Sequence, residues 1–218
     1  MKKRTALIIG STGLIGNSLV QFLVDSDHYE KVISIGRRNS GINHPKLSEV
    51  ITNLDDLHEL VLEDTIDDAF CCLGTTMKKA GSKDAFYKVD HEYVMKFAQL
   101  ASKLKAKTFN VVSAMGANKD SLVYYNRVKG QVENELIQLN FNTLNIYQPS
   151  LLLGDRKESR FGEDFGKIFN SVFNPLIPKK YKGIEGIKVA KSMITTALSS
   201  QNQKINYITS DIMQSLGV

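Results

Sequence analysis

Residues 5–16 run TALIIGSTGLIG, and no other stretch of the chain says more about its architecture. The first half is almost entirely apolar, as expected for a central strand of a parallel sheet that is covered on both faces. The second half holds Gly10, Gly13 and Gly16 and leads into an amphipathic helix. This order of strand, turn and helix predicts the opening of a doubly wound α/β fold.

The spacing of the three glycines also indicates a ligand. Gly10 permits a tight turn, Gly13 lets the backbone approach a diphosphate, and Gly16 lets helix and strand pack closely. The helix N-terminus adds unpaired N–H groups and a partial positive charge. A glycine-rich turn without a ligand is the alternative, but the flanking strand and helix favour a dinucleotide site. The residues expected to contact this cofactor are Gly10, Ser11, Thr12, Gly13, Leu14, Ile15 and Gly16.

The rest of the chain alternates short β-branched runs with longer helical patterns, which is typical of a parallel sheet. We predict an α/β fold with a Rossmann-type doubly wound parallel sheet of six to seven strands, in a single domain spanning 1–218. After Pro149 the alternation weakens, so residues of about 150–218, with a charge-rich loop at 155–160, are expected to form a small C-terminal, substrate-side lobe. The predicted strands are 5–9, 32–35, 49–51, 69–73, 109–113, 143–147 and 205–208, and the predicted helices are 14–24, 55–61, 84–104, 122–139, 184–198 and one starting near Ser210.

The end of the second predicted strand bears on the choice of dinucleotide. An acidic residue about 20 positions beyond the glycine turn is typical of NAD sites, where it binds the ribose 2′-hydroxyl. This chain instead has Gly36, Arg37 and Arg38 there. A guanidinium binds a 2′-phosphate bidentately, whereas a carboxylate would repel it. Two solvated surface arginines are the alternative, but their position favours NADP(H), with adenine contacts expected at Asn53 and Leu54.

Tyr125 and Lys129 form the only Tyr-x-x-x-Lys pair in the chain, and on a helix this spacing places both side chains on one face. Ser113 ends a predicted strand at the carboxyl edge, where ligands bind in open parallel sheets. The three groups suit carbonyl reduction. Tyr125 would donate a proton to the carbonyl oxygen, Ser113 would orient that oxygen, and Lys129 would hold the nicotinamide ribose and ease loss of the phenol proton. A surface Tyr–Lys pair beside an unrelated serine is the alternative, but the order of the motifs favours catalysis.

The composition is that of a globular protein, with 218 residues, 42% of them apolar, and a formal net charge of +5. Mild basicity favours anionic small molecules and does not indicate nucleic acid or membrane binding. The apolar run after the basic N-terminus is too short for a signal peptide or a membrane span. Because Cys71 and Cys72 are adjacent, they indicate reducing surroundings and two small buried side chains. We expect a cytoplasmic protein without membrane insertion or a metal site, and with surface histidines at His28, His44, His58 and His91.

Several segments carry a family resemblance: FCCLGTT at 70–76, FNVVS at 109–113, VKG at 128–130 and LGDR at 153–156. They resemble the atypical branch of the short-chain dehydrogenase/reductase superfamily, and more closely the Tat-interacting oxidoreductase family of small NADP(H)-binding proteins. The resemblance covers nearly the whole chain and implies the phosphate-binding, 2′-phosphate-binding and catalytic roles assigned above. It further implies that Leu73, Gly74 and Thr75 line the cofactor and that Pro149 and Ser150 lie near the nicotinamide.

The resemblance also marks two departures. Many enzymes of the wider superfamily have asparagine where this chain has Asp90, and many have glycine where it has Ser150. Mammalian members of the closer family look like cofactor-binding regulators. We therefore expect an NADP(H)-dependent oxidoreductase that uses Ser113, Tyr125 and Lys129 on a small carbonyl or alcohol substrate. The alternative is an NADP(H)-binding regulator without turnover that signals to a protein partner. The sequence also leaves open whether the protein forms a homodimer. Nucleotide-sugar epimerisation ranks last, because the lobe is short for holding a second nucleotide.

Overall fold

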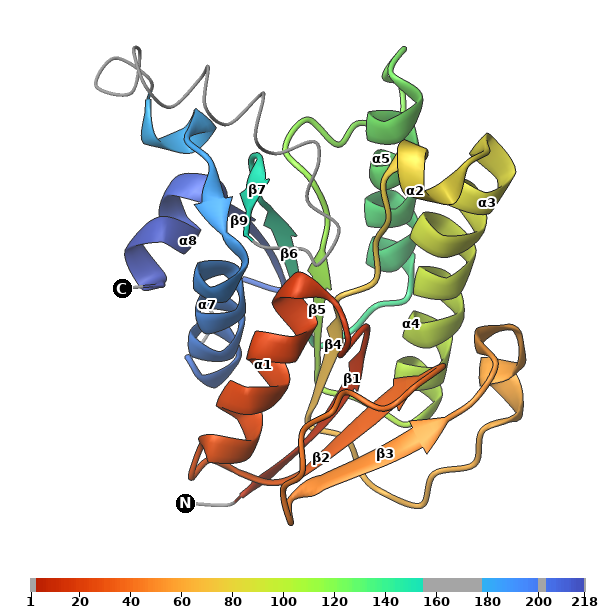
Figure 1. Cartoon of the computed structure of the whole chain (residues 1–218), viewed down its shortest axis with the longest axis vertical. Helices are drawn as coiled ribbons and strands as arrows, with labels where there is room; N and C mark the ends of the chain where they lie inside the picture. The colour runs from red at the N-terminus through yellow and green to blue at the C-terminus, as the bar shows by residue number, and fades with distance from the viewer. Residues whose placement is uncertain (1–2, 155–177, 200–202, 218) are drawn as a thin grey trace.

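The computed structural model describes residues 3–154, 178–199 and 203–217. Within these residues, seven parallel strands form one sheet in the middle layer of the molecule (Figure 1). This sheet confirms the predicted doubly wound architecture and its number of strands. In spatial order the strands are β3 (Leu47–Ile51), β2 (Tyr29–Gly36), β1 (Arg4–Ile9), β4 (Asp68–Cys71), β5 (Thr108–Val112), β6 (Thr143–Gln148) and β9 (Ile205–Thr209).

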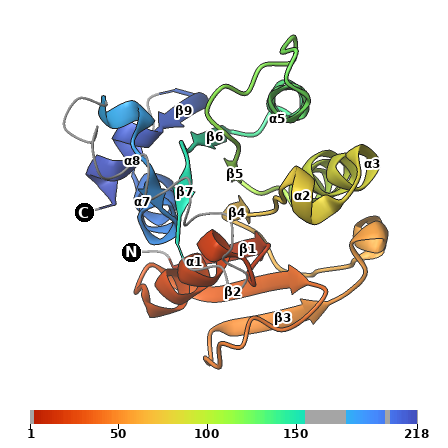
Figure 2. The same ribbon diagram turned by 45° about the horizontal axis from the view of Figure 1, so that its top comes forward.

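Helices cover both faces of the sheet (Figures 1 and 2). On one face lie α1 (Leu14–Asp25) and α7 (Gly186–Leu198), and on the other lie α4 (Tyr93–Lys103) and α5 (Tyr124–Gln138). The strand order changes direction between β1 and β4, which is the switch point where ligands bind in such sheets. The remaining elements are α2 (Met77–Ala80), α3 (Lys83–Tyr87), α8 (Ser210–Leu216), the 3₁₀ helices η1 (Leu54–Glu59) and η3 (Lys179–Tyr181), the π-helical turn η2 (Lys88–Glu92), and the paired short strands β7 (Leu152–Leu153) and β8 (Ile184–Glu185).

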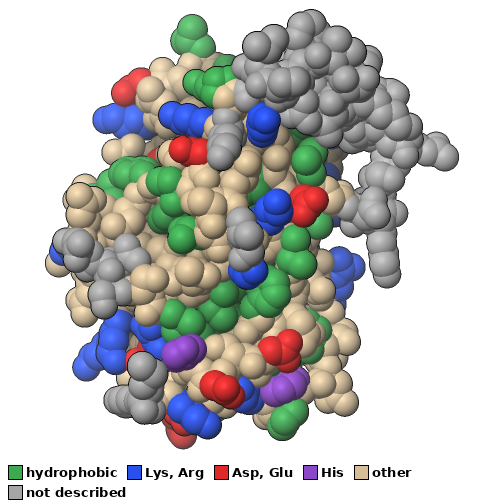
Figure 3. All heavy atoms as spheres, turned by 90° about the vertical axis from the view of Figure 1, so that its left-hand side faces the viewer, with side chains coloured by type: hydrophobic (Ala, Val, Ile, Leu, Met, Phe, Trp, Pro, Cys, Tyr) green, Lys and Arg blue, Asp and Glu red, His purple; other side chains and the backbone are tan. Residues whose placement is uncertain are grey.

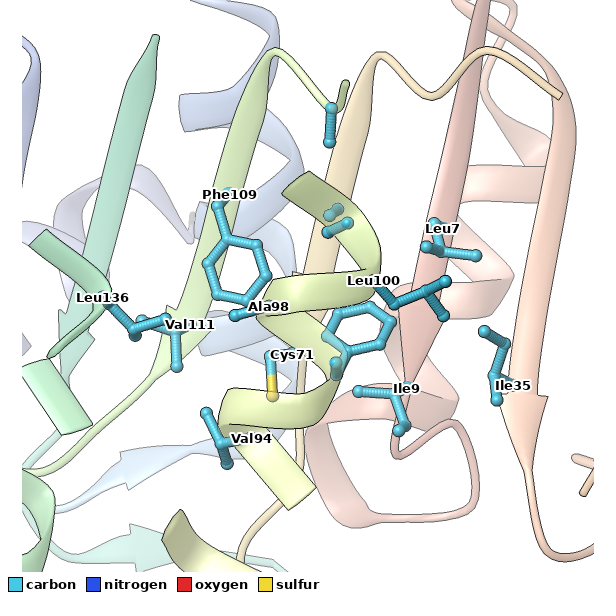
Figure 4. Close-up of a cluster of buried hydrophobic side chains, with 14 of the residues drawn as sticks. Leu7, Ile9, Ile35, Cys71, Val94, Ala98, Leu100, Phe109, Val111 and Leu136 are labelled. Atoms are coloured by element: carbon cyan, nitrogen blue, oxygen red, sulfur yellow. The ribbon is translucent and has the colours of Figure 1, made fainter. Parts of the chain in front are cut away.

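An apolar cluster fills the space on each side of the sheet. Along β1, Leu7 and Ile9 belong to the cluster under α4, whereas Ala6 and Ile8 belong to the cluster under α1. Figure 4 shows the first cluster, in which side chains of α4 lie against those of the strands. A strand with helices on both faces has no solvent-exposed face, which explains why β1 is apolar at successive positions.

The predicted helix at 84–104 is confirmed as a continuous helical run over 83–103, with a π turn inside it. The helix α3 ends at Tyr87, the π turn η2 follows, and α4 begins only at Tyr93. Within the π turn Asp90 and His91 are both buried. The prediction of a surface position is therefore wrong for His91, which stacks on the Tyr87 ring and contacts Glu135 at 2.8 Å.

Smaller differences concern element type and bounds. The helix predicted at 55–61 is the 3₁₀ helix η1, and the helix predicted from residue 184 begins at Gly186 because Ile184 belongs to β8. Cys71 lies in the cluster under α4 and Cys72 packs against the other one, which confirms both as small apolar side chains. Burial raises the pKa of the Cys71 thiol to about 12, so this thiol stays protonated.

The predicted C-terminal lobe, residues 150–218, lies partly outside the described residues, and its charge-rich loop at 155–160 lies wholly outside them. Its described parts join the main layers, because α7 packs on α1 and β9 pairs with β6 at the sheet edge. A Cβ on Gly186 would lie 2.6 Å from the Leu14 side chain. The start of α7 therefore lies directly against the glycine turn.

Three further observations concern the surface, membrane spans and metal sites. The face shown in Figure 3 carries hydrophobic side chains scattered among Lys/Arg and Asp/Glu side chains. In the part of the chain that the structure describes, no helix is long and apolar enough to span a membrane. The same residues contain no group of three or more His, Cys, Asp or Glu side chains arranged to hold a metal ion.

Candidate functional site

Close backbone contacts shape the glycine turn. Gly10 has a φ of +87°, and its carbonyl oxygen accepts a hydrogen bond from the Gly13 N–H at 3.0 Å. A Cβ on Gly10 would lie 2.7 Å from the Cys72 backbone, and a Cβ on Gly16 would lie 2.2 Å from the Gly10 carbonyl oxygen. Both positions therefore require glycine so that β1, β4 and α1 can meet at the carboxyl edge of the sheet.

Gly13 is different, because the protein itself leaves more room there. The residue is exposed, its φ is −84°, and an added Cβ would come no closer than 3.3 Å to another atom. As the N-cap of α1 it offers no side-chain hydrogen bond, so the first N–H groups of the helix remain open to an anion. A Cβ on Gly13 would extend into this open space in front of the helix.

The other side chains of the turn point in different directions. Ser11 is buried and accepts a hydrogen bond from the Ser34 hydroxyl at 2.8 Å, and Ile15 belongs to the apolar core. Thr12 is exposed, and Leu14 is half-buried. Ser11 and Ile15 can therefore meet a cofactor only through their backbone atoms.

Arg37 and Arg38 are exposed immediately after β2. Within the described residues neither guanidinium forms a hydrogen bond or an ion pair, so both are available to an anion. Asn53 is exposed and its side chain caps η1 by accepting the Asp55 N–H at 3.3 Å, while Leu54 packs in the core. Of the two residues expected at the adenine, only Asn53 has a side chain at the surface.

Lys129 lies at the carboxyl edge and is almost completely buried, with 4% of the residue exposed. Its Nζ lies 2.7 Å from Oδ1 of the fully buried Asp90. The second oxygen, Oδ2, accepts the Thr75 N–H at 2.8 Å. A Cβ on Gly74 would lie 3.5 Å from Oδ1 and 3.8 Å from Nζ, so the loop after β4 runs directly over the ion pair.

The charges around Lys129 decide its protonation. Burial alone lowers the pKa of a lysine, but the Asp90 carboxylate and the nearby Tyr125 phenol outweigh it and raise the pKa of Lys129 above its usual value. The group is therefore an ammonium at neutral pH. The interaction with Tyr125 fits the expectation that this spacing places the phenol near the ammonium on α5.

Tyr125 stands in the first turn of α5, half-buried, with its ring packed against that of Phe86 at a centroid distance of 5.5 Å. Its hydroxyl forms no hydrogen bond within the described residues. The neighbouring Tyr124 differs, because its hydroxyl donates to the Lys83 carbonyl oxygen at 3.1 Å. Tyr125 thus carries a free donor beside a cation.

The hydroxyl of Ser113 is engaged by a group outside this pair. It is buried just after β5, and its hydroxyl donates to Oε1 of Glu133 on α5. Gln148 donates to both oxygens of the same carboxylate at 3.1 Å. Since Glu133 follows Tyr125 by eight residues on one helix, the two lie about 12 Å apart along its axis. The structure brings Tyr125 and Lys129 together but ties the hydroxyl of Ser113 to a different group.

The sequence predictions do not include a role for Glu133, although its spacing from Lys129 indicates one. It follows Lys129 by four residues on α5 and so shares the face that meets the sheet. Burial raises the pKa of Glu133, and hydrogen bonds from Ser113 and Gln148 and the charge of Lys129 oppose this. Nothing local in the sequence predicts which strand residues it contacts.

Pro149 and Ser150 follow β6 at the same edge. Pro149 is buried, and its carbonyl oxygen accepts the Met115 N–H at 2.9 Å. The Ser150 hydroxyl donates to the Lys182 carbonyl oxygen and lies 2.8 Å from the Ser210 hydroxyl. Ser150 therefore ties the end of β6 to the start of α8.

A parallel sheet with a glycine turn at its switch point and a Tyr–Lys helix beside it defines a dinucleotide-binding protein of the short-chain dehydrogenase type. Comparison with known families agrees with this class. The chain belongs to the NAD dependent epimerase/dehydratase family, which it matches over residues 6–207. The resemblance predicted from the sequence is thereby confirmed.

The chain is also similar to individual curated proteins and solved structures. It is 32% identical to Protein HTATIP2 of Rattus norvegicus over 100% of this chain and 90% of that protein. It is 35% identical to Protein FMP52, mitochondrial, of Candida glabrata over 87% of this chain and 86% of that protein. Among structures, it is similar to the UDP-N-acetylglucosamine 4-epimerase of Methanobrevibacter ruminantium M1 (TM-score 0.71, 17% identity, 99% of this chain and 81% of that one). It is also similar to a short chain dehydrogenase family protein of Francisella tularensis (TM-score 0.68, 13% identity, 97% and 99%), and both likenesses show the fold alone.

Proposed function

We propose that the protein is an NADP(H)-dependent oxidoreductase that acts on a small carbonyl or alcohol substrate. The observation that carries the proposal is the place of Lys129, a buried ammonium next to Tyr125 at the edge where the glycine turn opens. Burying a lysine and its acid partner is costly, so a role for the charge in the site accounts for its presence.

NADP(H) is the cofactor that best fits the residues of this edge. The N–H groups at the start of α1 would hold its diphosphate, and the loop from Leu73 to Thr75 would line it. Arg37 and Arg38 would hold the 2′-phosphate, and the lack of any described protein partner for either guanidinium supports this choice. The family supports a nicotinamide cofactor in general.

The cofactor, when bound, supplies or accepts a hydride. Tyr125 would give its hydroxyl proton to the substrate oxygen as that oxygen gains charge, because its hydroxyl is otherwise free. Lys129 would hold the nicotinamide ribose and fix the orientation of the phenol. Ser113 can orient a substrate carbonyl only if its hydroxyl leaves Glu133, so the proposal assigns proton transfer to Tyr125.

Turnover of NADPH on a panel of aldehydes and ketones tests the proposal. Tyr125→Phe should lower kcat by about a hundredfold or more, with the affinity for NADPH unchanged, because only the proton donor is lost. Tyr124→Phe is the matched control, since its hydroxyl is engaged by Lys83 and should leave kcat within about twofold. A Tyr125→Phe variant that binds NADPH and keeps full activity contradicts the proposed proton donor.

One observation favours a second candidate, an NADP(H)-binding regulator without turnover that signals to a protein partner. The hydroxyl of Ser113, one of the three predicted catalytic groups, is donated to Glu133 rather than left free. A parent protein that binds NADPH tightly but turns over no carbonyl, alcohol or nucleotide-sugar substrate would favour this candidate. Release or capture of a protein partner on addition of NADPH would then support it directly.

The cytoplasm is the location we propose from the sequence. The names of the FMP52 relatives state a mitochondrial location for those proteins, which makes mitochondria the alternative. Fractionation of cells that express the full chain with a C-terminal tag distinguishes the two.

A further inference from the structure

The Asp90 carboxylate, which faces Lys129, has no role in the proton transfer proposed above. Asp90 is fully buried and reaches the site from the π turn η2, which packs against α5. Its Oδ1 lies 2.7 Å from Lys129 Nζ, and its Oδ2 accepts the Thr75 N–H. One carboxylate thus joins α5 to the loop after β4, the two segments between which a nicotinamide ribose would lie.

We propose that Asp90 is a positioning residue: by neutralising the Lys129 ammonium, it keeps the Tyr125 hydroxyl in the protonated form that can donate to a substrate oxygen. The inference rests on the proposed function and adds to it the form in which Tyr125 meets the substrate.

The argument is electrostatic. An ammonium beside a phenol favours the phenolate, because opposite charges attract. A carboxylate bound to that ammonium repels the phenolate. Because the Coulomb energy falls only with the first power of distance, this repulsion cancels a large part of the attraction between ammonium and phenolate. The pair as a whole is neutral. The titratable groups that face Lys129 are Asp90 from η2, Tyr125 and Glu133 from α5, and the protonated thiol of Cys71 from β4.

The two directions of the reaction need different forms of Tyr125. Reduction would use the Tyr125 proton at the carbonyl oxygen while a bound NADPH supplied the hydride to the carbonyl carbon, and it would leave an alcohol, NADP⁺ and a phenolate that water reprotonates. Oxidation of an alcohol needs the phenolate at the start, as the base. Replacing Asp90 with a neutral group should therefore raise the initial rate of alcohol oxidation relative to that of carbonyl reduction, each measured at neutral pH with saturating substrate, while the equilibrium between alcohol and carbonyl stays the same.

The test is a pH titration of tyrosinate absorbance on the full chain without cofactor. Each protein is compared with its own Tyr125→Phe counterpart, so that the difference reports Tyr125 alone. Asp90→Asn should move the Tyr125 transition to lower pH by about one unit. Lys129→Met should move it to higher pH, and adding Asp90→Asn to Lys129→Met should bring it back down. Asp90→Asn is thus compared once with the parent and once in the Lys129→Met background. Either comparison suffices, so the test remains possible if one of the single variants fails to fold.

The result that overturns the inference is a Tyr125 transition at the same pH with and without Asp90, in both comparisons. A merely structural Asp90 would produce that result, because it would change stability and not the titration. Activity gives a second readout: in Asp90→Asn the ratio of the initial rate of alcohol oxidation to that of carbonyl reduction, each at pH 7 and saturating substrate, should rise about tenfold. If the titration shifts but no variant turns over any substrate, the role of Asp90 stands and the proposed oxidoreductase activity falls.

Discussion

Two buried carboxylates stand at opposite ends of β4, and only one belongs to the candidate site. Asp68 begins the strand at the amino edge of the sheet, whereas Asp90 meets the loop that follows it at the carboxyl edge. Each pairs with a cation, Asp68 with Arg4 at 2.8 Å and Asp90 with Lys129 at 2.7 Å. Both carboxylates are fully buried, although the Arg4 side chain is more exposed (26%) than that of Lys129 (5%).

Their surroundings separate them. The cluster at the amino edge is closed, because Arg4 also donates to the Ala197 carbonyl oxygen and the Tyr29 hydroxyl donates to Asp68. At the carboxyl edge the ion pair stands beside a Tyr125 hydroxyl that has no hydrogen bond in the described part of the chain. A buried ion pair thus indicates a functional site only when unpartnered groups lie next to it at the edge where ligands bind.

The largest effect is expected from Lys129→Met, which leaves Asp90 buried without its cation. The free energy of unfolding at pH 7 should fall by about 3–5 kcal/mol, measured by urea denaturation. The double variant Asp90→Asn/Lys129→Met removes both charges and should recover much of this loss. A loss below about 1 kcal/mol in Lys129→Met would mean that water already solvates the pair, contrary to the burial described here.

Gly16→Ala should have the next largest effect on stability. It compares two glycines at the carboxyl edge, Gly16 and Gly13. Its Cβ would lie 2.2 Å from a backbone oxygen, so β1 and α1 must move apart, at a cost of about 3 kcal/mol in unfolding free energy. Gly13→Ala is the matched control, with an expected cost of about 0.5 kcal/mol or less and an affinity for NADPH reduced about tenfold. If Gly13→Ala binds NADPH as the parent does, the diphosphate does not lie at this turn.

Asp68→Asn tests the amino edge through its pH dependence. Burial raises the pKa of Asp68 from 3.8 to about 6, against the opposing charge of Arg4. A carboxyl group with a raised pKa contributes stability that is present below about pH 3.8 and is lost as pH rises through about 6. Between these values the parent should therefore lose about 2–3 kcal/mol that Asp68→Asn does not lose.

Urea denaturation of both proteins at several pH values measures this difference. NADPH titration is the control, because the amino edge takes no part in binding and the affinity should stay within about twofold of the parent. The same pH slope in both proteins would show that Asp68 does not carry it.

The glycine turn and the alternation of strands and helices along the chain could be predicted because both depend on residues that are near in sequence. The apolar run of β1 and the spacing of Gly10, Gly13 and Gly16 each specify local structure. The pairing of Tyr125 with Lys129 follows in the same way from the helical repeat.

Contacts between distant segments could not be predicted. The apolar stripe across 84–104 looks continuous, since one inserted residue barely alters its spacing, and so the π turn that buries Asp90 and His91 leaves no clear trace. The bond from Ser113 to Glu133 joins β5 to α5, and that from Arg4 to Asp68 joins residues 64 positions apart. Such partners are chosen by tertiary packing, which local patterns do not specify.

Equilibrium titration of the purified chain with NADPH and with NADH, followed by nicotinamide fluorescence, tests most directly whether the carboxyl edge is the binding edge. NADPH should bind at least about tenfold more tightly than NADH, and Arg37→Ala/Arg38→Ala should remove this preference without changing the affinity for NADH. Equal or tighter binding of NADH would contradict the role of the two arginines. Failure of either nucleotide to bind would contradict the site as a whole.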